Sequence, residues 1–237
     1  MSRLTNYLST RRQIRALYRS VPDVDHIGHH FSQYGEDIIL RGYFPRNYKG
    51  FYVDVGALHP YRFSNTALFH RLGWQGINIE PSAEGYRALN EARREDINLC
   101  VAVGSQEGTC TYEMFDEPAF NRLKTTSLHL EETALGPRPT REVTVPVAPL
   151  ATILSKHLPT GTVIDFLTVD CEGVDLDVLR SNDWNQYIPR LVCVEDWKPI
   201  VDSEIVLFLS KQGYEHVGQT HNTRILRHES FRDREVA

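Results

Sequence analysis

Residues 51–57 read Phe-Tyr-Val-Asp-Val-Gly-Ala, and residues 76–81 read Gly-Ile-Asn-Ile-Glu-Pro. Each stretch holds an apolar run that is too short for a helix, is bordered by glycine, and carries a carboxylate at or near its end. Such runs are typical of strands buried on both faces of a parallel sheet. About one strand–helix unit separates the two stretches, so the sequence predicts an α/β fold in which they are neighbouring strands.

Asp54 and Glu80 lie at the carboxyl ends of these two predicted strands. Ligands of open parallel sheets bind at this edge, and Gly56 lets the backbone approach a ligand closely because it has no side chain. A carboxylate after the second strand suits the two hydroxyls of a ribose, and one after the first strand suits an ammonium group. The alternative interpretation is that both acids only cap helices or turns.

Five segments, taken in order, resemble the FkbM family of S-adenosylmethionine-dependent methyltransferases, and the resemblance extends from about residue 31 to about residue 227. It implies a class I methyltransferase (Rossmann-like) fold, with a seven-stranded, mostly parallel sheet and an antiparallel terminal hairpin. It also implies O-methylation, often of a sugar or polyketide hydroxyl. The five segments are residues 31–37, 52–60, 64–66, 73–81 and 164–173.

The expected cofactor is therefore S-adenosylmethionine, with Asp54 at its ammonium end and Glu80 at its ribose. Ser105, at the end of the third predicted strand, occupies the place where the adenine lies in related folds. Gln33 and Asp37, in the expected helix before the first strand, are expected to close over the amino-acid end; the alternative for Asp37 is a helix-surface acid. The predicted cofactor-binding residues are Gln33, Asp54, Gly56, Ala57, Glu80 and Ser105.

Acids also follow the fourth and fifth predicted strands, in the runs 170–173 and 195–197. In one interpretation Asp170, Glu195 and Asp196 hold Mg²⁺ or a similar divalent cation, which lowers the pKa of the acceptor hydroxyl. This arrangement is similar to that of metal-dependent catechol and macrolide-sugar O-methyltransferases, although Glu195 stands first in the acid pair. In the other interpretation a carboxylate acts directly as general base. In a third interpretation these acids only cap neighbouring helices or pair with arginines.

Methyl transfer needs an aligned nucleophile and the removal of one proton. Asp170, His59 and His221 are the predicted catalytic residues. His59 follows the glycine turn, and His221 lies in the terminal hairpin, which borders the acceptor pocket in this fold. Imidazole titrates near neutrality and suits a general base, although histidines that serve only as hydrogen-bonding surface residues are common.

The chain has 237 residues, of which 41% are hydrophobic and 24% charged, as in an ordinary globular domain. Its formal net charge of -5 argues against nucleic acid as a partner. No apolar stretch is long enough to span a bilayer and no secretory signal is visible, so cytoplasmic residence is expected. The four cysteines are not closely paired, which argues against a zinc site.

Residues 1–30 are expected to form a basic, amphipathic helical arm and a linker, and residues 31–237 a single methyltransferase domain. The arm has three alternative uses: a lid, a surface that docks on an anionic membrane or an acidic protein, or a solvated helix. Residues 120–140 are expected to be a flap. Expected helices cover 32–44, 64–72, 82–92, 149–157 and 203–212; expected strands cover 50–55, 76–80, 97–103, 109–114, 142–147, 163–170, 191–195, 214–219 and 223–227.

Two other functions compete with methyl transfer to a sugar or glycan, or to a natural product such as a polyketide. A nicotinamide-dependent oxidoreductase also places an acid on its second strand, but Ala57 to Pro60 follow Gly56 where a glycine-rich pattern is needed. A silent cofactor-binding protein is the second competitor. The sequence does not indicate an oligomeric state.

Overall fold

The structure is a computed structural model that describes residues 30–124 and 137–231. Residues 31–237 group into one compact unit. The predicted helical arm lies outside the described residues apart from His30, and so does the central part of the predicted flap, residues 125–136. Within the described part of the chain, no helix has the length and apolar character needed to cross a membrane.

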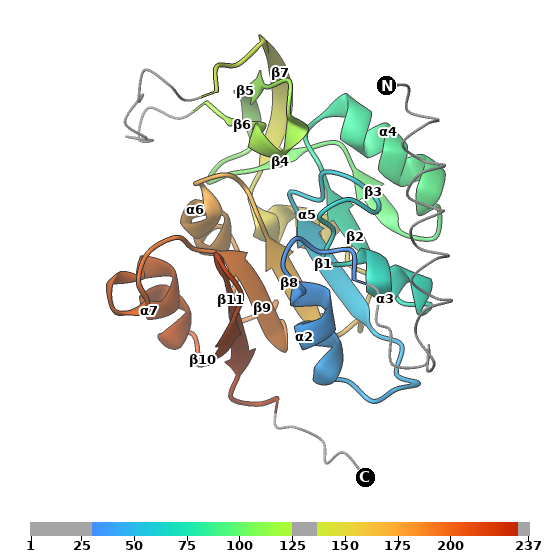
Figure 1. Cartoon of the computed structure of the whole chain (residues 1–237), viewed down its shortest axis with the longest axis vertical. Coiled ribbons are helices and arrows are strands. Elements are labelled where there is room, and N and C mark those ends of the chain that lie inside the picture. Colours follow the sequence, from blue (N-terminus) through green and yellow to red (C-terminus); the bar gives the residue numbers. More distant parts are fainter. Residues whose placement is uncertain (1–29, 125–136, 232–237) are drawn as a thin grey trace, which may run out of the picture. The chain divides into compact units, whose positions relative to one another are not determined.

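The main sheet has seven strands in the order β10-β11-β9-β8-β1-β2-β3, as Figure 1 shows. The five strands from β9 to β3 run parallel, whereas β11 is antiparallel to both of its neighbours, β9 and β10. This confirms the predicted α/β fold, with a mixed sheet that ends in an antiparallel hairpin. The bounds are β1 Phe51–Val55, β2 Gln75–Ile79, β3 Ile97–Leu99, β8 Phe166–Val169, β9 Leu191–Glu195, β10 Tyr214–Gln219 and β11 Thr223–His228.

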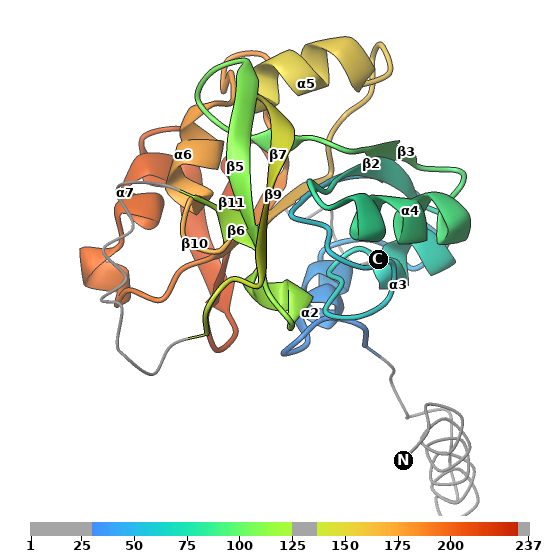
Figure 2. The same ribbon diagram turned by 90° about the horizontal axis from the view of Figure 1, so that it is seen from above.

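Helices cover both faces of this sheet (Figures 1 and 2). Val53 and Val55 of β1 belong to a core cluster that includes residues of α5, α6 and α7, whereas Tyr52 belongs to a second cluster with residues of α2 and α3. Alternate residues of one strand therefore feed two separate hydrophobic layers, which explains the unbroken apolar runs of the sequence. The bounds are α2 Glu36–Gly42, α3 Ala67–Arg71, α4 Ala83–Ala92, α5 Leu150–His157, α6 Asp175–Arg180 and α7 Glu204–Ser210.

A second sheet of four strands has the order β4-β7-β5-β6 and lies beyond the carboxyl edge of the main sheet, at the top of Figure 1. It corrects the predicted third strand, residues 97–103. That segment is split into β3, which pairs with β2, and β4, which pairs with β7, because the buried Ala102 packs with Tyr112 and Val145 of the second sheet. The bounds are β4 Ala102–Val103, β5 Gly108–Met114, β6 Arg122–Leu123 and β7 Arg141–Ala148.

Several helix ends also differ from prediction. The first helix begins at Glu36 rather than at residue 32, because Gly35 has a left-handed φ of 91° and the carboxylate of Asp37 accepts hydrogen bonds from the Phe31 amide (2.8 Å) and the Ser32 hydroxyl (2.7 Å). These bonds shape residues 31–35 into a turn. The expected helix 64–72 begins at Ala67. Helix α6 was not expected.

Candidate active site

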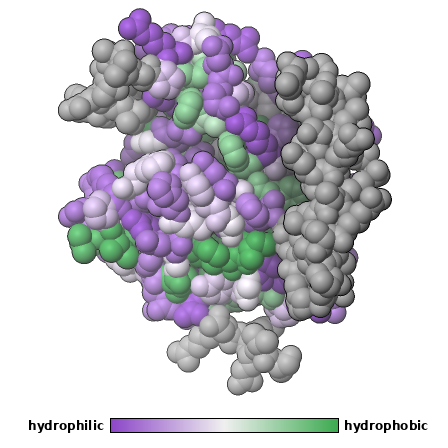
Figure 3. Space-filling view, in the orientation of Figure 1, coloured by the Kyte–Doolittle hydropathy of each residue, from purple (hydrophilic) through white to green (hydrophobic). Residues whose placement is uncertain are grey.

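A cavity that is partly open to solvent lies at the carboxyl ends of β1, β2, β8 and β9. The second sheet also lines it, through Tyr112 of β5, the short 3-10 helix Pro118–Phe120 and Leu123 of β6. Both sheets therefore frame the cavity. Figure 3 shows that the surface of the molecule in this orientation is mostly hydrophilic, with hydrophobic residues over α2 and α7.

Asp54 is buried and lines the cavity. The hydroxyl of Thr66 donates a hydrogen bond of 2.6 Å to its Oδ2. Burial raises the pKa of Asp54 to about 6, against the opposing effects of the Thr66 hydrogen bond and the Arg93 charge. Near neutral pH the group is thus mainly a carboxylate that accepts hydrogen bonds or pairs with a cation.

Glu80 is also buried and lines the cavity. Its Oε1 accepts a hydrogen bond of 2.7 Å from the Ser82 amide, and its Oε2 accepts one of 2.9 Å from the Leu58 amide. Leu58, whose amide contacts Glu80, has a left-handed φ of 49°, a costly conformation for a residue other than glycine. A carboxylate has about four acceptor sites, so each oxygen keeps capacity for one ligand hydroxyl. The backbone thus fixes Glu80 in an orientation that suits a diol.

The turn after β1 brings Gly56 and Ala57 to the cavity wall. The amides of both residues donate to the carbonyl oxygen of Ile79, at 3.0 and 3.2 Å. Gly56 has a φ of 82°. Gln33 lines the cavity from the segment before α2 and is exposed. Five of the predicted cofactor residues therefore line the cavity: Gln33, Asp54, Gly56, Ala57 and Glu80.

Three further carboxylates, those of Asp170, Glu172 and Glu195, line the cavity. Asp170 faces the open cavity, but the surrounding protein and then the negative charge of Glu195 raise its pKa well above the ordinary value. Burial and the neighbouring acids raise the pKa of Glu172 to about 8, and burial and Asp175 raise that of Glu195 to about 7. These groups hold protons at a pH where isolated carboxyls are ionised.

Four residues predicted from the sequence do not line this cavity. Nδ1 of the exposed His59 accepts hydrogen bonds from the amides of Tyr61 (3.1 Å) and Arg62 (3.0 Å). The ring centroid of His221 lies 5.6 Å from that of Trp197, at the rim. Ser105 follows β4, and its expected place at the end of a main-sheet strand is wrong because the chain has already entered the second sheet; Val101, Ala102 and Val103 line the cavity instead.

Asp196 is the fourth of these residues, and its placement bears on the metal hypothesis. Its carboxylate forms a buried ion pair with Nε of Arg224 (3.5 Å) and accepts a hydrogen bond of 3.1 Å from the Lys198 amide. Among the described residues, no group of three or more His, Cys, Asp or Glu side chains is arranged to hold a metal ion. The predicted set of Asp170, Glu195 and Asp196 therefore does not fit a divalent cation here.

The methyltransferase FkbM domain model matches residues 54–216 of this chain. The chain belongs to the FkbM methyltransferase domain family. One similar solved structure is the crystal structure of methyltransferase FkbM from Methylobacillus flagellatus KT, which is 13% identical, with a TM-score of 0.45. The match covers 84% of this chain and 48% of that one, so this chain spans about half the length of that protein. No curated protein matches the chain.

The cavity of this FkbM domain also contains residues that the sequence did not single out. Asn222 donates a hydrogen bond of 2.6 Å to Oε1 of Glu195, and Asn65 donates one of 2.9 Å to Oγ1 of Thr168. Tyr112 and Phe120 line the cavity from the second sheet and the 3-10 helix. Asn65 lies in the family-like segment 64–66 and Phe120 in the expected flap, but nothing in the sequence pointed to Tyr112, because the pairing that brings the second sheet over the cavity is long-range.

Proposed function

We propose that this FkbM domain catalyses O-methylation, in which a methyl group passes from S-adenosylmethionine to a hydroxyl of a sugar or glycan. The observation that carries the proposal is the pair Asp54 and Glu80. Both are buried carboxylates at the ends of adjacent strands, both line the same cavity, and Glu80 is oriented by two backbone amides.

The sheet topology supports a class I methyltransferase fold for the domain. The strand order β3-β2-β1-β8-β9-β11-β10, with β11 reversed, gives a seven-stranded, mostly parallel sheet with an antiparallel terminal hairpin, as the resemblance implies. It places the switch point between β1 and β8, where strand order reverses and ligands of open sheets bind. Asp54 and Asp170 flank that point.

In the proposed complex Glu80 accepts hydrogen bonds from the ribose hydroxyls and Asp54 pairs with the ammonium group of the amino-acid part. The wall formed by Val101, Ala102 and Val103 suits the flat, largely apolar base. When bound, S-adenosylmethionine supplies a methyl group on a positively charged sulfur. The acidic cavity stabilises a ligand with that charge.

Asp170 is the proposed general base. Its carboxylate lines the cavity and takes the proton of the acceptor hydroxyl as the oxygen bonds to the methyl carbon and the carbon–sulfur bond breaks. A carboxylate with a raised pKa is a stronger base than an isolated one, and the positively charged sulfur of the bound cofactor would favour the ionised form of Asp170 that this role requires. Glu195, which Asn222 orients, is the nearby second carboxylate.

The proposal of a sugar acceptor is supported by aromatic side chains at the cavity. Phe63, Phe120 and Trp197 all line it and are 42%, 46% and 68% exposed. Exposed aromatic rings gathered at one cavity can pack against the apolar faces of sugar rings while carboxylates bind the hydroxyls. A polyketide hydroxyl is the alternative acceptor.

Two measurements test the function. In calorimetry the purified chain is expected to bind S-adenosylmethionine and S-adenosylhomocysteine and not NADH; heat from NADH alone would favour the oxidoreductase and overturn the proposal. In transfer assays with methyl-labelled cofactor, label is expected in a glycan extract and is expected to survive alkali, which cleaves methyl esters but not ethers. No transfer to any hydroxyl compound, despite tight cofactor binding, would point to a silent cofactor-binding protein.

Cytoplasmic residence, exclusion of nucleic acid as a partner, and docking through the N-terminal arm remain proposals from the sequence. The arm lies outside the described residues, apart from His30.

A further inference from the structure

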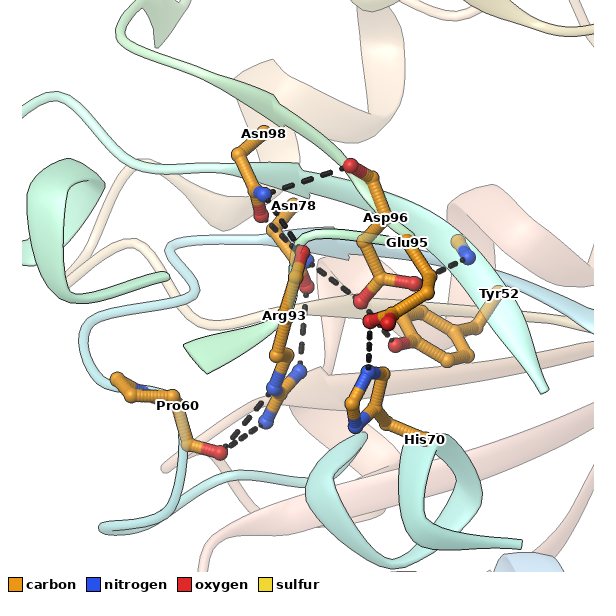
Figure 4. A network of polar contacts seen from close by, with 9 residues as sticks. Tyr52, Pro60, His70, Asn78, Arg93, Glu95, Asp96 and Asn98 are labelled. Carbon is orange, nitrogen blue, oxygen red and sulfur yellow. Dashed lines mark hydrogen bonds and ion pairs between the residues drawn. The ribbon is translucent and has the colours of Figure 1, made fainter. Parts of the chain in front are cut away.

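Arg93 is the C-cap residue of α4, and its side chain is completely buried. Burying a guanidinium is costly unless hydrogen bonds and nearby negative charge compensate for the lost water. Its hydrogen-bond partners among the described residues are all neutral. Figure 4 shows the group between Pro60 and Asn78. This placement requires an explanation beyond packing.

The five N–H groups of the guanidinium are all used. Nε donates to the carbonyl oxygen of Pro60 at 3.1 Å, and Nη1 donates to Oγ1 of Thr66 at 2.7 Å and to Oδ1 of Asn78 at 3.3 Å. Nη2 donates to Oγ of Ser64 at 2.7 Å and to the Pro60 carbonyl. Three of the four acceptors lie between β1 and α3, so Arg93 ties down the segment that follows the cavity turn.

Two of the neutral partners connect Arg93 to carboxylates. The Thr66 hydroxyl accepts from Arg93 and donates to Oδ2 of Asp54 at 2.6 Å. The Asn78 amide accepts from Arg93 and donates through Nδ2 to Oδ2 of Asp96 at 3.0 Å. A hydroxyl has one proton, so with Arg93 on its oxygen the proton of Thr66 is directed at Asp54.

We propose that Arg93 is a positioning residue for the cofactor site: acting through Thr66, it keeps Asp54 ionised and fixed in orientation for the ammonium group. This inference rests on the proposed function for the identity of the ligand. The arrangement at Asp54 itself does not depend on that identity. Thr66 donates a hydrogen bond to Oδ2 of Asp54. Among the described residues no hydrogen bond reaches Oδ1 of Asp54, so that oxygen is available to a ligand.

A merely structural arginine would stabilise the fold without controlling the charge of Asp54. Burial raises the pKa of Asp54 to about 6, and both the Thr66 hydrogen bond and the Arg93 charge oppose the rise. Removing the Thr66 hydroxyl should therefore raise this pKa further. The charged or titratable groups that act with Asp54 from the surrounding elements are Tyr52, Glu80, Arg93, Asp96, Asp170 and Cys193.

The test compares Thr66→Val with Thr66→Ser in the full chain. Valine keeps the shape and removes the hydroxyl, whereas serine keeps the hydroxyl. Carbon-13 NMR of the Asp54 carboxyl, titrated without cofactor, is expected to show a pKa about one unit higher in Thr66→Val and little changed in Thr66→Ser. An equal pKa in wild type and Thr66→Val would overturn the inference, whatever the ligand proves to be.

Calorimetry with S-adenosylmethionine provides the second readout. If the pKa rises by about one unit from about 6, the ionised fraction falls about twofold at pH 7 and about fivefold at pH 6, and affinity should fall by the same factors. A loss of affinity that is the same at both pH values would contradict the inference that Thr66 acts by keeping Asp54 ionised. Absence of binding by the wild type would refute the proposed cofactor instead, while the NMR titration would still decide whether Thr66 controls the charge of Asp54.

Arg93→Lys gives a further check, since lysine keeps the charge but has three donors instead of five. In Arg93→Lys the carbon-13 titration is expected to give an Asp54 pKa between those of wild type and Thr66→Val, and hydrogen exchange is expected to be faster in the segment between Pro60 and Thr66. An Asp54 pKa and exchange rates equal to those of wild type would show that Arg93 does not act on Asp54. If Arg93→Lys does not fold, Arg93→Gln takes its place in the same titration, because glutamine keeps a hydrogen-bond donor and removes the charge.

Discussion

A Cβ atom at Gly56 would lie 1.9 Å from the backbone carbonyl oxygen of Asp170, so the turn after β1 and the end of β8 are in direct contact. Gly56 also has a φ of 82°, which other residues adopt at a cost. No side-chain rearrangement relieves a clash with backbone. Glycine is therefore required at the point where the first and fourth parallel strands of the chain meet the cavity.

We predict that Gly56→Ala destabilises the fold by roughly 2–4 kcal/mol and abolishes cofactor binding, because the turn must move away from β8. Thermal unfolding and calorimetry measure the two effects. Gly42→Ala is the matched control, since Gly42 ends α2 with open space around its Cβ position. Wild-type affinity in Gly56→Ala would contradict this interpretation of the turn.

Glu80→Gln is expected to weaken S-adenosylmethionine binding about tenfold or more and to cost about 1–3 kcal/mol of stability. Glutamine has one oxygen for the amides of Ser82 and Leu58, so its NH₂ group must face one of these donors. Glu84→Gln, at an exposed position of α4, should leave both quantities close to wild type. If the two variants behaved alike, Glu80 would have no special role.

The carboxyl cluster predicts an unusual pH dependence of stability. The pKa of Glu172 is raised to about 8 by burial and then by Glu195 and Asp175, so the folded state holds a proton that the unfolded chain releases at lower pH. The free energy of unfolding therefore falls as pH rises from about 5 to about 8, because the native state binds more protons than the unfolded state.

Glu172→Gln should remove part of that slope, since glutamine has no proton to lose. Melting temperatures of wild type and variant, measured across this pH range, test the prediction. The exposed Glu204→Gln serves as control. A variant that retains the full wild-type slope would show that Glu172 is ionised throughout.

Trp197→Ala is expected to raise KM for the acceptor about tenfold while leaving the Kd of S-adenosylmethionine within twofold, because its exposed ring lines the cavity at the rim. Trp197→Phe should lose less, since it keeps an aromatic face. Equal losses of cofactor and acceptor binding would show that Trp197 supports the cavity instead of contacting the acceptor.

Local pattern was sufficient to predict the strands of the main sheet and to place Asp54 and Glu80 at one edge, whereas the seven-stranded arrangement was expected from the family resemblance. Their strands are short apolar runs between glycines, and alternate residues such as Tyr52 and Val53 pack into two layers. The antiparallel terminal hairpin was expected both from the alternating residues 214–219 and 223–227 and from the resemblance. These features depend on neighbouring residues, which a single sequence displays directly.

Long-range pairing explains the errors. The switch of the chain from β3 to β4 depends on contacts of Ala102 with β5 and β7, far along the sequence, so the predicted position of Ser105 was wrong. The burial of Asp196 likewise depends on Arg224 in β11. Arg93, whose acceptors lie 15 to 33 residues away, gave no local signal.

A crystal structure of the full chain with S-adenosylhomocysteine tests the central claim most directly. The account predicts that both ribose hydroxyls lie within hydrogen-bond distance of the Glu80 carboxylate and that the amino group lies beside Asp54. A nucleotide bound elsewhere, or one bound in this cavity without contact to either carboxylate, would contradict it.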